Sequence, residues 1–278
     1  MIGSLLVPID SSIYARSATT HAVELGKLYQ ARLTGLYVLD VRYLEMPPYL
    51  DYSYTFEAVP PTLLPLDVLE KFRAKSERLL AEFREVGEKA GLEVETRTEE
   101  GVPSQVIADL GRSFDLVIMG KRGEHAKWGR DLLGSTAENV IRRADTPVLL
   151  VEEEARGLAN LLLLFDGSGS ASRALKLAAD LAAHTGASLW VLTVDDDREH
   201  GLSVQEEART YLEPLGLDVA YRLEEGRVTR VALALLEEQD CDLVVVGRQG
   251  HSALHHLILG STAEHLMRAV ERPVLLVP

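Results

Sequence analysis

Short runs of consecutive apolar residues alternate along the whole chain with amphipathic segments. Unbroken runs of Val, Leu and Ile are typical of strands that are buried on both faces of a parallel sheet. They predict five strands in each half of the chain, at residues 4–9, 32–39, 92–98, 115–120, 147–151, 160–165, 188–194, 217–223, 242–247 and 273–277.

Helical periodicity fills the segments between these strands. It predicts the first helix of each half at residues 17–29 and 172–184, and the third at 105–112 and 229–238. Alternation of strands and helices is typical of an α/β sandwich with right-handed crossovers and an open parallel sheet.

The last third of each half carries the same pattern twice. Residues 120–151 and 247–277 share Gly-x-x-Gly, a spacer of ten or nine residues, Gly-Ser-Thr-Ala-Glu, a helical run and Pro-Val-Leu-Leu-Val. Such a repeat in 278 residues indicates two tandem domains. We predict domains at 1–151 and 160–278. The acidic linker 152–159 lacks Gly/Ser-rich character, so we expect the domains to pack against each other.

The two halves differ between their second strand and second helix. In the first half this connection is residues 41–66, which are rich in Pro and Tyr. In the second half it is residues 195–202. A loop as long as 41–66 is usually functional or mobile. A lid over a pocket, a partner-docking surface and a plain insertion are the three alternatives. In the shorter gap, the run of Asp at 195–197 is interpreted as a solvated turn rather than a Mg²⁺ site.

Composition and charge argue against a nucleic-acid-binding, secreted or membrane protein. The formal net charge of −14 would repel a phosphate backbone, so nucleic acid is not an expected partner, although local donors can still hold one nucleotide. Cys241 precedes an apolar run, which indicates a core thiol. The N-terminus meets Asp10 too early for a signal peptide, and no stretch approaches 18 consecutive apolar residues. We therefore expect a cytoplasmic protein without membrane contact.

The repeated motif has the features of a phosphate cradle. In open parallel sheets, ligands bind beyond the carboxyl ends of the strands, where the strand order reverses. The glycines at the strand-to-loop corners, Gly120 and Gly123 in the first copy and Gly247 and Gly250 in the second, would allow φ > 0 and close approach of a phosphate. Free N–H groups, hydroxyls and the helix dipole then favour an anion at Gly134, Ser135 and Thr136, and at Gly260, Ser261 and Thr262.

Other roles for these residues stay open. Ser135 and Ser261 are also good N-caps, with Glu138 and Glu264 three residues on completing a capping box. The joint spacing, present in both copies, favours the cradle. Two arginines inside the Gly-x-x-Gly loops would either reach a phosphate or be solvated, namely Arg122 and Arg248.

Competing motifs are excluded or weak. No Gly-x-x-x-x-Gly-Lys-Ser/Thr occurs, which excludes a P-loop NTPase, and residues 167–169 do not complete a dinucleotide fingerprint. Four histidines surround the second motif without a carboxylate or cysteine partner, so no metal site is predicted at His251, His255, His256 and His265.

The duplicated motif resembles the nucleotide-binding pattern of the universal stress protein family, Gly-x-x-Gly, nine residues, then Gly-Ser/Thr. The resemblance covers the chain apart from residues 41–66 and the linker. It implies two five-stranded α/β sandwich domains that are adenine nucleotide alpha hydrolase-like. The spacer has the family length in the second copy and one extra residue in the first. If only one cradle binds nucleotide, we therefore expect it to be the second.

The resemblance also implies contacts to an adenine nucleotide. An Asp after the first strand meets the base, and a Val near the end of the second strand offers backbone contacts to it. The residue before the first glycine packs near the ribose and phosphates. The matching residues are Asp10, Val38 and Met119 in the first copy, with Pro8 before the Asp, and Asp166, Val194 and Val246 in the second. Helix capping is the alternative role for both aspartates.

The sequence shows no arranged nucleophile or general base. Phosphoryl transfer needs groups that position the reactants in line and neutralise charge. The sequence shows only residues that would bind the nucleotide. We therefore expect an ATP-binding regulatory stress protein without efficient catalysis, with Mg²⁺ accompanying the nucleotide and a protein partner of unknown identity. A slow ATPase or a protein that phosphorylates itself on one of the cradle hydroxyls is one alternative. A scaffold without nucleotide is the other.

The family resemblance carries an expectation about assembly as well. It implies that the Pro-Val-Leu-Leu-Val edge strands pair the two domains within the chain. Further assembly into a homodimer is left open by the sequence.

Overall fold

The computed structural model describes residues 2–44, 65–124, 133–249 and 259–278. Within these ranges ten strands form one sheet in the order β3-β2-β1-β4-β5-β10-β9-β6-β7-β8. All ten predicted strands are present: β1 (Ser4–Pro8), β2 (Arg32–Asp40), β3 (Val94–Gly101), β4 (Leu116–Gly120), β5 (Val148–Val151), β6 (Asn160–Leu164), β7 (Ser188–Val194), β8 (Val219–Glu224), β9 (Leu243–Gly247) and β10 (Val274–Val277). The fold is the predicted pair of parallel-sheet α/β units.

Helices connect the strands, at α1 (Ile13–Tyr29), α2 (Val41–Leu44), α3 (Pro65–Lys89), α4 (Pro103–Gly111), α5 (Ser135–Arg143), α6 (Gly169–Thr185), α7 (Arg198–Leu212), α8 (Val228–Glu238) and α9 (Ser261–Ala269), with a 3₁₀ turn at Glu213–Leu215. Of the predicted 41–66 insertion, residues 45–64 lie outside the described ranges. None of the helices in the described ranges combines the length and apolar character that a membrane span requires.

Helix starts differ from the prediction where a polar residue caps the helix ahead of the apolar pattern. The Ser12 Oγ accepts a hydrogen bond from the Ala15 N–H at 3.1 Å, so α1 begins at Ile13 rather than residue 17. In the second half the Asp197 carboxylate caps α7. The expectation that 195–202 is a loop is therefore wrong beyond Asp197, because Arg198 already begins the helix.

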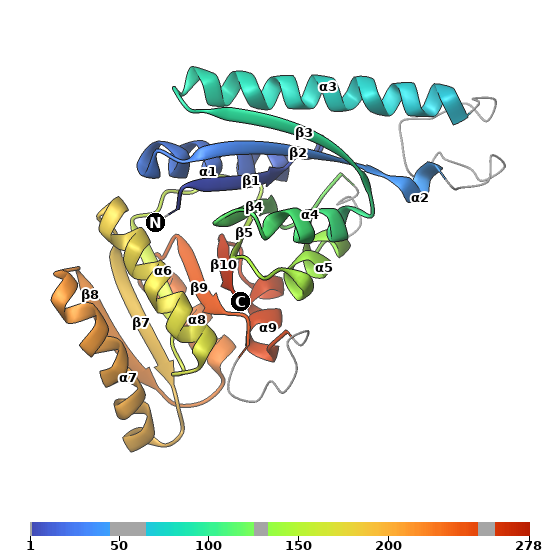
Figure 1. Cartoon of the computed structure of the whole chain (residues 1–278). Helices are drawn as coiled ribbons and strands as arrows, with labels where there is room; N and C mark the ends of the chain where they lie inside the picture. The colour runs from blue at the N-terminus through green and yellow to red at the C-terminus, as the bar shows by residue number, and fades with distance from the viewer. Residues whose placement is uncertain (1, 45–64, 125–132, 250–258) are drawn as a thin grey trace.

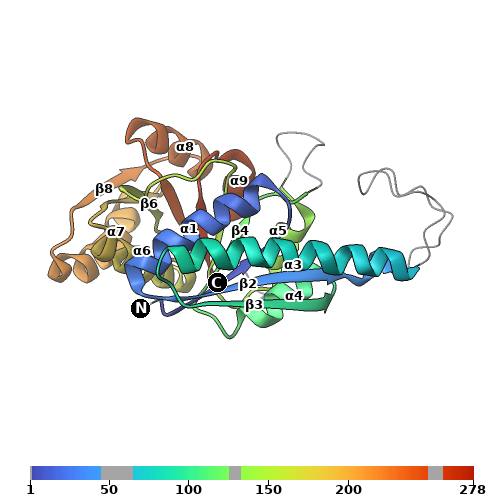
Figure 2. The ribbon, with the colours of Figure 1, turned by 90° about the horizontal axis from the view of Figure 1, so that it is seen from above.

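The core lies on both faces of the sheet, and helices cover both (Figures 1 and 2). One cluster of buried side chains packs the sheet against α1, α3, α6 and α7, and the other packs it against α4, α5, α8 and α9. Strand residues alternate between the clusters: Leu5 and Val7 belong to the first, and Leu6 to the second. Burial on both faces explains why the strands read as continuous apolar runs.

The two halves join edge to edge at the centre of the sheet. β5 and β10 pair antiparallel, with Leu149 opposite Leu275, whereas the pairs within each half are parallel. The predicted pairing through the Pro-Val-Leu-Leu-Val strands is confirmed. Each half keeps the order third, second, first, fourth and fifth strand, so the order reverses between β1 and β4 and again between β6 and β9.

Two buried cations cross this junction at matching positions of the repeat. Lys121 follows Gly120 and donates through Nζ to the carbonyl oxygen of Val270 at 2.7 Å, at the end of α9. Arg248 follows Gly247 and donates to the carbonyl oxygen of Ala144, at the end of α5. A cation is favourable at a helix C-terminus, so each half stabilises a helix end of the other.

Ion pairs between α5 and α9 repeat the same two-fold relation. Arg268 lies 3.2 Å from Glu138, and Arg142 lies 3.7 Å from Glu264. Each arginine also pairs with the glutamate one turn earlier on its own helix. The four side chains are between 27% and 36% exposed, so this network adds modestly to the stability of the junction.

Cys241 is buried without a disulfide, and burial raises the pKa of its thiol to about 12. The predicted core thiol is confirmed.

His21 is a fully buried titratable group in α1. Among the described residues neither ring nitrogen has a hydrogen-bond partner, and burial lowers the pKa of the imidazole from 6.5 to about 4. The folded protein thus keeps His21 neutral under conditions in which the unfolded chain protonates it. The free energy of unfolding should therefore fall as the pH drops from 6.5 towards 4.

We expect His21→Leu, which installs the residue found at the matching position of the second half, to remove this loss. Between pH 7 and pH 5 the free energy of unfolding of wild type should fall by about 2 kcal/mol more than that of the variant. Each unit by which the pKa of the folded state differs from that of the unfolded state is worth about 1.4 kcal/mol. Urea unfolding at the two pH values measures the difference. Equal losses in the two proteins would contradict the prediction.

Candidate functional site

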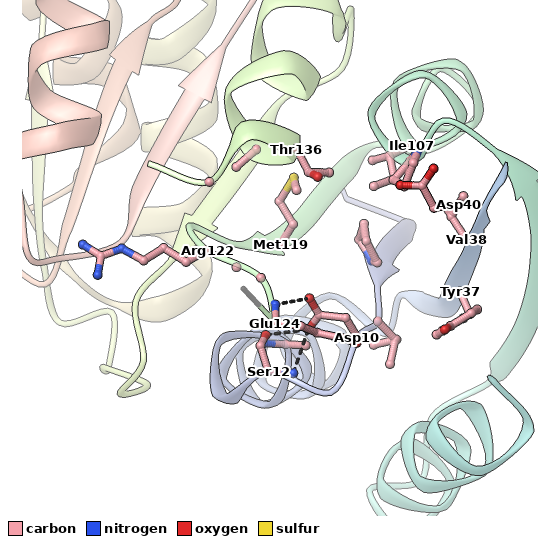
Figure 3. Close-up of a pocket in the computed structure, with 18 of the residues that line it drawn as sticks. Asp10, Ser12, Tyr37, Val38, Asp40, Ile107, Met119, Arg122, Glu124 and Thr136 are labelled. Carbon is pink, nitrogen blue, oxygen red and sulfur yellow. Dashed lines mark hydrogen bonds between the residues drawn. The ribbon is translucent and has the colours of Figure 1, made fainter. Parts of the chain in front are cut away.

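A cavity of about 430 Å³ lies beyond the carboxyl ends of β1, β2 and β4, where the strand order of the first half reverses (Figure 3). The structure brings together in its lining all of the site residues predicted in the first copy: Pro8, Asp10, Val38, Met119, Gly120, Arg122, Gly123, Gly134, Ser135 and Thr136. The position is the one at which open parallel sheets bind ligands.

The glycines of the motif are required for close approach rather than for an unusual backbone. Of the four corner glycines, the structure describes Gly120, Gly123 and Gly247, and none of these three has a positive φ, so that part of the expectation is wrong for them. A Cβ on Gly120 would lie 2.5 Å from the Cβ of Tyr14, and one on Gly123 would lie 2.9 Å from Oδ2 of Asp10. Gly120 lets the end of β4 touch α1, and Gly123 lets the loop touch Asp10.

The start of α5 forms the anion-favouring end of the cavity. Gly134 is its N-cap and Ser135 its first helical residue, and no side chain caps this turn. The capping-box alternative to the cradle is wrong in both copies, since Gly134 and Gly260 are the N-caps and Ser135 and Ser261 lie inside their helices. The first-turn N–H groups, the helix dipole and the hydroxyls of Ser135 and Thr136 at the cavity wall together suit a phosphate.

Asp10 ties two loops together beside the cavity (Figure 3). Its Oδ1 accepts hydrogen bonds from the Ser12 backbone N–H at 2.9 Å and the Ser12 Oγ at 2.5 Å, and its Oδ2 accepts one from the Glu124 N–H at 3.2 Å. Burial raises the pKa of Asp10, with the Glu124 charge adding to the rise and the Ser12 hydrogen bonds opposing it. The capping alternative for this aspartate is wrong, because Ser12 is the cap.

Sequence reasoning missed the opposite wall of the cavity. It is formed by side chains of β2, α2 and α3, among them Asp40, Arg42, Phe72 and Lys75. Arg42 pairs with Asp40, and Lys75 pairs with Glu124. Glu124 was within reach of sequence reasoning because it directly follows Gly123. No local pattern links it to Lys75, which lies 49 positions earlier.

The arginines of the two loops have different surroundings from those expected. The Arg122 guanidinium lies 6.0 Å from the centre of the Tyr14 ring, and Figure 3 shows it pointing away from Asp10 and Met119. Arg248 is only 7% exposed and donates to the carbonyl oxygens of Ile141 and Ala144. The expectation that Arg248 reaches a phosphate or is solvated is therefore wrong.

The second copy is described in part. Asp166 is exposed and accepts from the N–H of Ser168, which caps α6, so the capping role is wrong here too. Val194 and Val246 pack into the second core cluster. Gly247 contacts the start of α6, and Gly260 donates to the Arg248 carbonyl before Ser261 and Thr262 open α9.

Gly250 and residues 251–258 lie outside the described ranges, and with them three of the four histidines near this motif. The fourth, His265, has its ring Nδ1 2.6 Å from the Ser261 carbonyl oxygen. The expectation that the second cradle is the better nucleotide site stays a prediction. The cavity described above is lined by the first copy of the motif.

The aspartates of the β7–α7 turn each hydrogen-bond with protein groups. Asp195 pairs with His200, Asp196 accepts from the Gly226 N–H, and Asp197 caps α7. The described residues contain no group of three His, Cys, Asp or Glu arranged to hold a metal ion.

Known proteins share this fold and this sequence pattern. The sequence profile of the universal stress protein family matches residues 1–152 and again 158–278. The universal stress protein Slr1230 of Synechocystis sp. is 27% identical over 98% of this chain and 98% of its own length. One from Mycolicibacterium smegmatis is 25% identical over 98% of this chain and 96% of its own.

A solved universal stress protein of Archaeoglobus fulgidus has the same fold, with a TM-score of 0.79 over 99% of this chain and 97% of that one, at 24% identity. The chain belongs to the universal stress protein family, with two family domains in tandem.

Proposed function

We propose that the first-half cavity binds an adenine nucleotide, ATP accompanied by Mg²⁺, and that the protein is a nucleotide-dependent regulatory factor. The proposal rests on one observation: an apolar wall, an acidic acceptor and a helix start without a side-chain cap meet in one cavity. Its volume of about 430 Å³ falls within the range of small-molecule sites, about 300–1,000 Å³.

The two ends of the cavity suit the two ends of a nucleotide. Val38, Ile107 and Met119 offer an apolar surface for the base and ribose (Figure 3), and Asp10 offers an acceptor beside them. At the other end, Gly123 leaves the loop without a side chain, and the start of α5 presents N–H groups and hydroxyls to the phosphates.

Charge at the site favours a metal that arrives with the ligand. Asp10, Asp40 and Glu124 line the cavity together with three cations. Of these, Arg42 and Lys75 pair with carboxylates, and the Arg122 guanidinium lies 6.0 Å from the centre of the Tyr14 ring. The residues present fit a Mg²⁺ held mainly by the phosphates, with the Ser135 and Thr136 hydroxyls as additional oxygen ligands. The ion would neutralise phosphate charge that the protein's cations do not meet.

We infer binding without efficient turnover. Two acidic side chains of the cavity are engaged: Asp10, beside the apolar surface, accepts from Ser12 and from the Glu124 N–H, and Glu124 accepts from Lys75. Neither is placed as a free general base. Self-phosphorylation is the second candidate, because the hydroxyls of Ser135 and Thr136 lie at the anion end of the cavity. It would appear as label on the protein after incubation with γ-labelled ATP.

Calorimetric titration of the nucleotide-stripped full chain with Mg·ATP tests the proposal. We expect saturable heat with at least one nucleotide per chain, and two if the second cradle also binds. At 100-fold over its Kd the ligand should raise the free energy of unfolding by about 2.7 kcal/mol, visible as a thermal shift. Neither heat nor thermal shift would overturn the nucleotide function and leave a duplicated scaffold.

The domain limits 1–151 and 160–278, a cytoplasmic location and a protein partner contacted through residues 41–66 remain part of this proposal. A pull-down with and without Mg·ATP tests whether a protein partner binds in a nucleotide-dependent way. A homodimer would be detected by sedimentation of the purified chain.

A further inference from the structure

Helix α3 reaches the cavity with a charged side chain. The Lys75 Nζ lies 2.8 Å from Oε1 and 2.7 Å from Oε2 of Glu124, and the two side chains are 22% and 21% exposed. Glu124 belongs to the loop between β4 and α5, directly after Gly123. The ion pair therefore connects α3 to the loop that would hold the phosphates.

Glu124 is the meeting point of three segments. Its carboxylate accepts hydrogen bonds from Lys75 and from the Ser11 N–H at 2.9 Å, and its own N–H donates to Asp10 at 3.2 Å. Burial opposes the charge of Glu124, but the hydrogen bonds from Lys75 and Ser11 outweigh it and lower the pKa of the carboxyl. The carboxylate stays ionised and holds Lys75.

Helix α3 is anchored to the sheet from Ser76 onward, and the Ser76 Oγ lies 2.8 Å from Oγ1 of Thr98 in β3. Leu79, Leu80 and Phe83 are buried in the first core cluster, and a Cβ on Gly35 of β2 would lie 2.5 Å from the Phe83 ring. Its earlier part meets the cavity through Phe72 and Lys75. Figure 2 shows the start of α3 extending past the end of β3. The first turns of α3 thus have less of the sheet beneath them than the rest.

We propose that Lys75 is a positioning residue that couples occupancy of the cavity to the order of the first half of α3. The inference rests on the proposed nucleotide function and adds its regulation. A phosphate seated at Gly123 and Ser135 restricts residues 121–123, which join β4 to Glu124. Because Glu124 follows Gly123 directly, fixing the loop also fixes the carboxylate that holds Lys75. Ordering at one site then reduces motion at the other.

By sequence, the second half has no lysine at the position that matches Lys75. Residues 91–94 and 216–219 match in the repeat, which places His200 of α7 at the position of Lys75. The His200 Nδ1 lies 2.5 Å from Oδ2 of Asp195, at the end of β7, in an exposed pair. The link is therefore specific to the half that also carries the 41–66 segment.

Hydrogen exchange of the full chain, with and without Mg·ATP, tests the coupling. In wild type we expect ATP to slow exchange about fivefold or more both in the loop around Gly123 and in the first half of α3, a factor typical of coupled sites. Because Lys75 lines the cavity, Lys75→Met is compared with wild type at equal Mg·ATP saturation, as set by calorimetric titration of each protein. At that saturation the slowing in α3 should be lost relative to the slowing in the loop around Gly123. Lys75→Arg, which keeps a cation for Glu124, should restore it. Lys71→Met, an exposed change on the same helix, should behave as wild type.

The outcomes separate the two proposals. Binding heat in wild type without slowing in α3 overturns the coupling and leaves the nucleotide function intact. Slowing in α3 that survives Lys75→Met overturns the role of Lys75. No binding heat in wild type overturns the nucleotide function and the coupling with it.

Discussion

Replacing Gly123 by valine is expected to lower the affinity of the first-half cavity for Mg·ATP by about 100-fold or more. Gly123 lines the cavity, and even a Cβ there would lie 2.9 Å from Oδ2 of Asp10. A valine therefore either fills the space in front of the α5 start or displaces Asp10, and both remove ligand contacts. The loss corresponds to about 2.7 kcal/mol of binding free energy, and calorimetric titration measures it directly.

Gly157→Val is the matched control for this variant. Gly157 lies in the linker, and a Cβ there would meet no atom within 4 Å, so affinity should be unchanged. If the second cradle also binds, the Gly123 variant should keep one nucleotide per chain while the other site is lost. A folded Gly123→Val protein with wild-type affinity and stoichiometry would show that no ligand sits at this loop.

Arg248→Met is expected to lower the free energy of unfolding by about 3 kcal/mol. The guanidinium is buried and donates to the carbonyl oxygens of Ile141 and Ala144, across the junction between the halves. Methionine keeps the apolar stem but leaves these carbonyls at the end of α5 without their donor. Hydrogen bonds to a charged group contribute about 1.5–3 kcal/mol each, and buried acceptors left unpaired add a desolvation cost. Urea denaturation gives the value.

Arg230→Met supplies the comparison for Arg248, because Arg230 is exposed on α8. It should change stability by less than about 0.5 kcal/mol, as surface substitutions usually do. An Arg248 variant as stable as the Arg230 variant would mean that the cross-junction hydrogen bonds contribute little.

The strands were predictable because their burial on both faces is written directly into the sequence as apolar runs. Helix starts were less so, since Ser12 and Asp197 cap α1 and α7 ahead of the apolar periodicity. A cap is a polar residue with no periodic signal of its own. The predicted start of α1 was therefore too late, and the first turn of α7 was assigned to a loop.

The part of the site that the Gly-x-x-Gly motif supplies was predictable, and the wall formed by β2, α2 and α3 was not. The motif fixes the order of Gly120, Gly123, Gly134 and Ser135, so their convergence follows from a strand, a loop and a helix start in sequence. Lys75 joins them only through tertiary packing of α3. The role of Arg248 was mistaken because a charged residue in a glycine loop usually faces solvent. The signal that was missed is that a basic residue, Lys121 or Arg248, follows the first glycine in both copies.

The antiparallel pairing of β5 and β10 relates the two halves by an approximate two-fold axis within one covalent chain. In a dimer of identical subunits every substitution at such an interface occurs twice, and each must suit both sides. Joining the copies by residues 152–159 removes that constraint and keeps the partners at high effective concentration. The two halves were free to diverge. A lysine lies on one side of the junction and an arginine on the other, and the 25-residue α3 of the first half corresponds to the 15-residue α7 of the second.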